Sequence, residues 1–127
     1  MKYFVLLGRI LYTAIFLISA PNHFFSGTIA YAAANGVPMP FILVPLSGII
    51  AFAGALSILI GYKAKYGALL IVLFLVPVTL TMHNFWAVND PSMAMIQQIM
   101  FLKNMSMLGT ALVIAHFGSG PLSMDNR

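Results

Sequence analysis

Residues 41–60 have the sequence FILVPLSGIIAFAGALSILI, an apolar stretch without a single charged side chain. A helix needs roughly 20 such residues to cross the hydrocarbon core of a bilayer. Three more apolar stretches of similar character lie at about 3–20, 66–85 and 91–117. The chain is therefore predicted to be an all-α integral membrane protein, a four-transmembrane-helix bundle that forms one domain over residues 1–127.

The composition requires lipid as the solvent. The chain is 61% hydrophobic and 6% charged, whereas a soluble domain carries roughly 25% charged residues. The net charge of +4 comes from six scattered Lys and Arg residues, so there is no basic stripe along which a nucleic acid could bind. The absence of Cys excludes disulfides, thiolate metal sites and haem attachment.

The connection between the first two spans, residues 21–40, predicts a short interfacial helix. Ser26-Gly27-Thr28 leads into IAYAAAN, and Gly36 then ends the pattern as a helix stop does. Aromatic residues flank the segment, which favours a position in the membrane interface over a crossing. These aromatic residues are Phe24, Phe25 and Tyr31.

The first span also has features of a secretory signal peptide, because Ser19 and Ala20 are small. However, Arg9 interrupts its apolar stretch, and cleavage after Ala20 would leave Pro21 as the first residue. We therefore expect the span to be retained.

The distribution of cations predicts the orientation of the chain. With four spans, one side of the membrane receives Lys2, Arg9, Lys63, Lys65 and Arg127. The opposite loops, 21–40 and 86–90, contain no Lys or Arg. By the positive-inside rule both termini are cytoplasmic, in a bacterial inner membrane. Trp86, Phe85 and Phe24 then mark the outer interface.

Lys103 is the polar residue that most needs an explanation. It lies twelve residues into a helix that begins near Pro91, roughly 18 Å along the axis and near the middle of the membrane. A Lys at that depth costs about 3 kcal/mol or more. Ser106 and Thr110 share its helix face, and Asn104 lies on the neighbouring stripe.

The chain offers Lys103 no counter-ion, because its only acids, Asp90 and Asp125, lie outside the spans. Either the amine is neutral, or a ligand or partner supplies an acceptor. The alternative is a structural Lys that donates to backbone carbonyls at a kink caused by Pro77. We expect Lys103 to face the bundle interior together with Asn104.

More polar residues gather at the outer ends of the first and third spans. These are His23, His83 and Asn84, with Trp86 close by. They are interpreted either as the mouth of a pocket that contains Lys103 or as interfacial side chains that bind water. No metal is expected, because His116 lies at the opposite membrane face.

Arg9 allows two interpretations as well. It lies about 9 Å from the cytoplasmic end of its helix, so its side chain can reach lipid phosphates. The alternative is that it belongs to the same pocket.

Small residues recur at helical spacing in the second span: Ser47, Gly48, Ala51, Gly54 and Ala55. Such a stripe lets a neighbouring helix approach closely. We expect it to be a packing face.

Five stretches together resemble the DoxX family over nearly the whole chain: LLGRILYTAIF, GYKAKYGALL, HNFW, FLKNMSMLGTALV and GSGPLSMD. The Lys103-Asn104 pair carries most of the resemblance. It implies a four-helix membrane bundle and a quinone-linked association. Two departures are that many relatives have Glu at the position of Ala51 and Lys at that of His23.

Three functions remain open. In a quinone-linked redox subunit, Lys103, Asn104 and His83 would bind a quinone while Trp86 and Phe85 stack on it. Since no cofactor is encoded, that role requires a redox partner protein. In an accessory or assembly subunit, Lys103 pairs with an acid of another protein. In a lipid or small-amphiphile binding or transport protein, the cations meet a headgroup. The bundle is thin enough to form a homo-oligomer, and whether the protein is an enzyme is left open.

Overall fold

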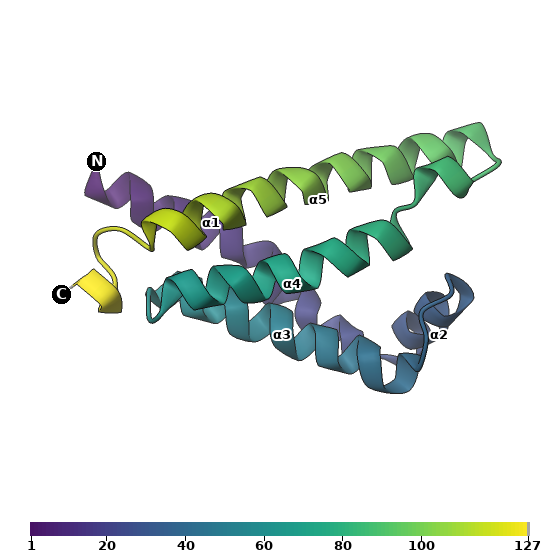
Figure 1. Cartoon of the computed structure of the whole chain (residues 1–127), viewed down its shortest axis with the longest axis horizontal. Coiled ribbons are helices and arrows are strands. Elements are labelled where there is room, and N and C mark those ends of the chain that lie inside the picture. Colours follow the sequence, from purple (N-terminus) through teal and green to yellow (C-terminus); the bar gives the residue numbers. More distant parts are fainter. Residues whose placement is uncertain (127) are drawn as a thin grey trace.

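The computed structural model describes residues 1–126, and its four long helices confirm the predicted membrane bundle. They are α1 (Lys2–Ser19), α3 (Pro40–Ile60), α4 (Ala64–Met82) and α5 (Pro91–Phe117). Each is long and apolar enough to cross a bilayer with its flanking turns. The described part of the chain contains no strand. The short helix expected between the first two spans is α2 (Ser26–Ala34) (Figure 1).

The structure differs from the prediction at the ends of the first and third spans. Pro21 does not end the first span, because the chain continues from α1 into the 3-10 helix η1 (Ala20–Phe24), where Pro21 occupies the first turn and needs no amide donor. The third span is not one continuous helix, because α4 ends at Met82 and the short η2 (Phe85–Ala87) follows within the span. The last described segment is η3 (Met124–Asn126), and Arg127 lies outside the described residues.

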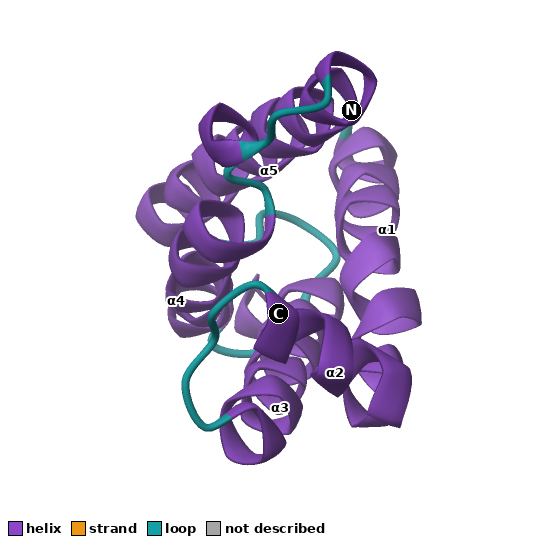
Figure 2. Cartoon of the chain, turned by 90° about the vertical axis from the view of Figure 1, so that its right-hand side faces the viewer, coloured by secondary structure: helices purple, strands orange, loops and turns teal. Residues whose placement is uncertain are grey.

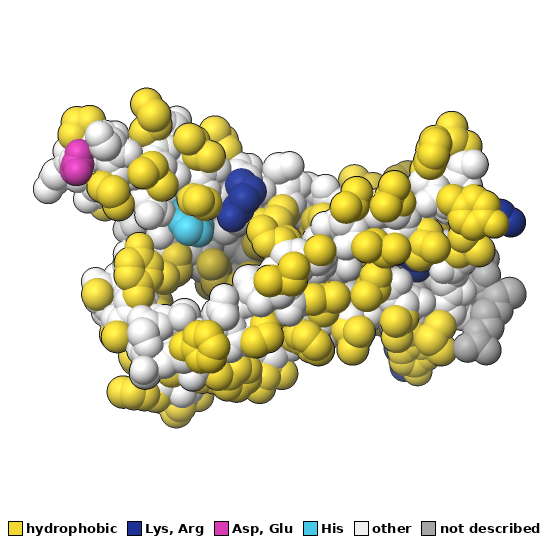
Figure 3. All heavy atoms as spheres, turned by 180° about the vertical axis from the view of Figure 1, so that it is seen from behind, with side chains coloured by type: hydrophobic (Ala, Val, Ile, Leu, Met, Phe, Trp, Pro, Cys, Tyr) yellow, Lys and Arg dark blue, Asp and Glu magenta, His cyan; other side chains and the backbone are white. Residues whose placement is uncertain are grey.

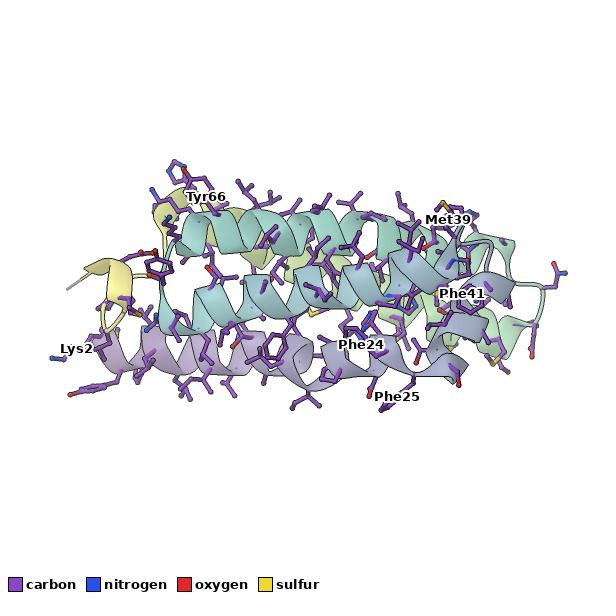
Figure 4. All side chains as sticks on the ribbon, turned by 90° about the horizontal axis from the view of Figure 1, so that it is seen from below. Lys2, Phe24, Phe25, Met39, Phe41 and Tyr66 are labelled. Carbon is purple, nitrogen blue, oxygen red and sulfur yellow. The ribbon has the colours of Figure 1, made fainter. Side chains whose placement is uncertain are left out.

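The two ends of the bundle differ in what they contain. Both chain termini and the α3–α4 turn lie at one end, which we call the terminal end (Figure 1). The segment η1–α2 and the α4–α5 connection lie at the other, which we call the histidine end because His23 and His83 are there. Figure 4 shows the same separation, with Lys2 and Tyr66 at one end and Phe24 and Phe41 at the other.

In the bundle, α3 packs against both α1 and α4, and α5 packs against α4. α1 also contacts α5, because the hydroxyl of Tyr12 donates to the carbonyl oxygen of Met107, at 2.6 Å. Figure 2 shows the four long helices nearly end-on. The predicted packing stripe is confirmed, since Gly48, Ala51, Gly54 and Ala55 are all buried. At Gly54 the contact is so close that an added Cβ would lie 2.8 Å from the carbonyl oxygen of Gly67.

Most of the remaining surface is apolar and faces the lipid bilayer. Large hydrophobic side chains are exposed on all four long helices, and they cover most of the space-filling view (Figure 3). The buried core is small and lies between α1, α3, α4 and α5, around Phe16, Ile58, Ile71 and Leu75. A chain with this surface is stable only in a membrane.

Candidate functional site

A cavity of about 550 Å³ opens at the histidine end. Its walls come from α3 and α4, and η1, α2 and the loop after α2 cover it. Most of the lining is aliphatic or aromatic. The polar side chains of the lining are few, namely His23, Thr28, Ser47, Thr81 and His83. The cavity is therefore an apolar space with a small number of hydrogen-bonding groups.

His23 is held in a defined orientation in this wall. Its Nδ1 lies 3.1 Å from the carbonyl oxygen of Ala20, and since a carbonyl only accepts, Nδ1 carries the proton. The ring packs edge-on against Phe74, with 5.6 Å between the centroids. Gly48 makes room for it, because an added Cβ there would lie 2.7 Å from the Cβ of His23. In the neutral ring, Nε2 is left as an acceptor.

His83 stands where α4 ends. Its Nδ1 lies 2.8 Å from Oε1 of Gln97, which ties the end of α4 to α5. With that amide oxygen as the acceptor, Nδ1 is again the donor and Nε2 is again left as an acceptor. The sequence-predicted pair His23 and His83 thus lines one cavity. Among the described residues, no group of three or more His, Cys, Asp or Glu side chains is arranged to hold a metal ion.

The expectation that Lys103 and Asn104 both face the interior is right only for Asn104. Asn104 is buried, whereas Lys103 is exposed and its Nζ contacts only the sulfur of Met100, at 3.6 Å. The physical reason is helix geometry, since consecutive residues point about 100° apart. The alternative, a Lys that donates to backbone carbonyls at a kink, fails as well, because Nζ of Lys103 makes no hydrogen bond to a carbonyl among the described residues.

Asn84 and Trp86 belong to the α4–α5 connection and do not line the cavity. The carbonyl of Asn84 accepts from the amide of Ala87. Trp86 is 59% exposed and packs edge-on against Phe85 and Phe101, with centroids 5.3 and 5.7 Å away. An exposed Trp at this end matches the predicted aromatic belt.

Arg9 lies at the terminal end, about 20 Å along the helix axis from His23. Only 4% of it is exposed, and it is not part of the histidine cavity. Its Nη2 donates to the carbonyl oxygens of Pro121 and Leu122, at 3.2 and 2.5 Å. The expectation that Arg9 shares the pocket of the histidines is therefore wrong, because the segment after α5 folds back over α1 and holds Arg9 at the terminal end. Its contact with lipid phosphates stays a prediction.

Sequence reasoning did not identify three residues that position the two histidines. Phe74, which lines the cavity, supports His23 and Gln97 orients His83, while Gly48 was expected only to pack helices. A Gln in a span about two turns beyond a capping Asp is a signal that was available in the sequence. Phe74 gave none, since one aromatic residue in an apolar span resembles any other.

Viewed from behind, the molecule is hollowed between two lobes on one side. One cationic and one histidine side chain lie next to each other at the edge of this hollow, away from the other coloured charges (Figure 3). These two polar side chains therefore lie beside a hollow that mostly hydrophobic side chains surround.

Comparison with known proteins identifies relatives over nearly the whole chain. The sequence model of the SURF4 family matches residues 2–127. Inner membrane protein YphA of Escherichia coli is 29% identical over 97% of this chain and 89% of its own length. Inner membrane protein YqjF of the same organism is 30% identical over 95% and 88%. No solved structure matches.

A longer relative matches only in part. The ER-derived vesicles protein ERV29 of Saccharomyces cerevisiae is 28% identical over 62% of this chain, and the match spans 25% of that protein. The chain thus spans most of its bacterial relatives and only about a quarter of ERV29.

The resemblance to the DoxX family is corrected by these matches. The family model that covers the chain is that of SURF4, and none of the relatives points to DoxX. None of the five short stretches that carried the resemblance is decisive alone. The quinone-linked redox role rested on that resemblance and is withdrawn with it.

Proposed function

The chain belongs to the SURF4 family, and we propose that it binds a lipid or small amphiphile inside the membrane, in the cavity at the histidine end. The observation that carries this proposal is an apolar cavity of about 550 Å³ with two fixed histidines in its wall. Ligand sites in proteins commonly have volumes of roughly 300–1,000 Å³ and few polar groups. The cavity fits that description.

The two histidines favour one kind of headgroup. Both use Nδ1–H within the protein, so each neutral ring offers Nε2 as an acceptor. A hydroxyl headgroup donates to such atoms, while a carboxylate cannot. We therefore expect a long-chain alcohol or a monoacylglycerol to bind better than a fatty acid at neutral pH.

Adjacent isoleucines of α3 provide a matched test. Ile50 lines the cavity, whereas Ile49 is 54% exposed on the outside of the helix. Ile50→Trp fills the cavity and should reduce the binding of radiolabelled hexadecanol at least tenfold, while Ile49→Trp should leave it unchanged. Equal binding by wild type and both variants would refute the site. Mass spectrometry of lipid extracted from the purified protein identifies the native occupant, and the same extract shows whether any quinone is bound.

A second function is favoured by the exposed face of α5. Lys103, Ser106 and Thr110 all lie exposed on it, and a cation there has no anionic partner among the described residues of the spans. A helix of another membrane protein that carries Asp or Glu would supply one. In that case the chain is an accessory subunit, and Lys103→Met should abolish co-purification of the partner without changing hexadecanol binding.

The two relatives from Escherichia coli are inner membrane proteins, which supports a location in a bacterial inner membrane. We propose that both termini face the cytoplasm, because the cations gather at the terminal end. A reporter that is active only in the periplasm should be silent after Arg127 and active when it is inserted near Asn35. The reverse pattern would invert the topology.

A further inference from the structure

The terminal end holds a buried cation whose donors are not all used. The Arg9 side chain is 4% exposed, and its guanidinium stays charged at any physiological pH. Nη2 binds two carbonyl oxygens, but Nε and Nη1 are buried without an acceptor among the described residues. Buried donors of this kind are rare in proteins and call for an explanation, such as a ligand.

No carboxylate of the described chain neutralises Arg9. Asp125 is the acid at this end, and its two oxygens accept from the backbone amides of Lys63 and Ala64, at 2.8 and 3.0 Å. Asp90 lies at the other end, where it caps α5 by accepting from the amide of Ser92. The cationic side chains at the terminal end, among them Arg9 and Lys63, therefore outnumber the acidic side chains there.

A hollow of about 480 Å³ lies next to this buried cation, between the start of α4 and the turn after α5. Its polar lining consists of Lys63, Lys65, Tyr66, Ser119 and Asp125, and the backbone amides of Lys63 and Ala64 hold the carboxylate of Asp125. Ser119 also forms part of the wall around Arg9. A Cβ added to Gly61 would lie 2.7 Å from Nη1 of Arg9 and 3.0 Å from Oγ of Ser119. Arg9 thus lies directly behind the wall of the hollow.

We propose that this hollow binds a phosphate group, with Lys63 and Lys65 at its mouth and Arg9 at its base. A phosphate has several oxygens, which suits a guanidinium and two ammonium groups better than a single carboxylate does. The hydroxyls of Ser119 and Ser123 now bond to each other at 2.9 Å. When that contact opens, a phosphate oxygen accepts from Ser119 and reaches Nη1 of Arg9.

Two sources of phosphate fit this position, an anionic lipid headgroup and free phosphate. Thermal unfolding in a neutral detergent distinguishes them, with dioleoylphosphatidylglycerol, dioleoylphosphatidylcholine or inorganic phosphate as the added probe. We expect phosphatidylglycerol or inorganic phosphate to raise the melting temperature and phosphatidylcholine to have a smaller effect. Stabilisation by phosphatidylglycerol alone assigns a lipid headgroup, and stabilisation by both assigns a site open to free phosphate.

Charge-matched variants show whether the effect belongs to the hollow. Lys63→Gln/Lys65→Gln leaves Arg9 in place and should weaken the apparent affinity for the stabilising probe at least fivefold. Arg9→Gln should weaken it as much, if it folds. Lys2→Gln removes a cation from the same end outside the hollow and should change nothing. The proposal is overturned if neither anionic probe stabilises the protein, or if Lys2→Gln weakens binding as much as the double variant.

Discussion

At the terminal end, Arg9 and Asp125 bind backbone groups of distant segments. At the histidine end, His23 binds the nearby carbonyl of Ala20 and His83 binds the side chain of Gln97, each through one ring nitrogen. The same four helices make both ends. The polar side chains differ in length. Arg9 extends from α1 to the segment 118–126, which therefore covers the terminal end of the bundle, and we also call this the closed end. The imidazole rings are short and leave a cavity. The histidine end is therefore the one with an apolar cavity that suits an amphiphile.

The largest loss of stability is expected from Gly61→Ala, which disturbs the packing at the terminal end. Gly61 has a φ of +72°, and an added Cβ would lie 2.1 Å from the Cβ of Ser123. The segment after α5 then cannot dock, and we expect a loss of about 3 kcal/mol or more from combined strain and overpacking. The control is Gly8→Ala, whose Cβ meets nothing within 4 Å. Thermal unfolding in detergent measures both, and similar curves would mean that the closed end contributes little.

A smaller loss of stability is expected from Gly48→Ala at the histidine end. The new Cβ would lie 2.7 Å from the Cβ of His23 and 3.0 Å from the carbonyl oxygen of Ala20. Because η1 has room to move toward the cavity, we expect a cost of about 1–3 kcal/mol together with weaker hexadecanol binding. Gly27→Ala at the same end meets nothing within 4 Å and serves as the control. If both variants bind equally well, the position of His23 does not matter for binding.

Asp125 makes the stability of the terminal end depend on pH. Hydrogen bonds from the backbone amides of Ala64 and Lys63 lower the pKa of Asp125 below 3.8. A lowered folded-state pKa adds stability above the unfolded value, and this stability is lost as the pH falls through the folded pKa. Asp125→Asn should therefore melt lower than wild type at pH 7, and the difference should shrink below about pH 3.8. A difference that is constant with pH would exclude the carboxylate as its cause.

The smallest change in stability is expected from Lys103→Met. Lys103 is exposed and has no salt bridge among the described residues, so its removal takes a costly charge out of the membrane. The variant should be as stable as wild type or more stable in thermal unfolding. A variant that unfolds more readily would show that Lys103 holds the helices together.

The sequence predicted the four spans well, because apolar length and the packing stripe on α3 are local properties. It also placed His23 and His83 at one depth, since both follow the ends of their spans. It could not predict which neighbours they bind. Nothing in the sequence around Arg9 shows that residues 121 and 122 return to it, because that contact joins the two ends of the chain.

Lys103 shows a second limit of prediction from the sequence. A Lys in mid-span demands a partner, and the sequence reasoning placed that partner inside the bundle. The orientation of a helix about its axis depends on its neighbours, and α5 packs against α4 and receives a hydrogen bond from Tyr12 of α1. The neighbouring Asn104 took the buried position instead.

The central claim is that the histidine end holds an amphiphile, and photo-crosslinking tests it most directly. Hexadecanol that carries a diazirine on its chain is illuminated with the purified protein, and the labelled peptides are mapped. The account predicts labels on the cavity-lining parts of α3 and α4, at residues 43–50 and 73–78, which are lost in Ile50→Trp and competed by monoacylglycerol more than by palmitate. Labels spread evenly over the lipid-facing side chains of all four long helices, unchanged by Ile50→Trp, would contradict it.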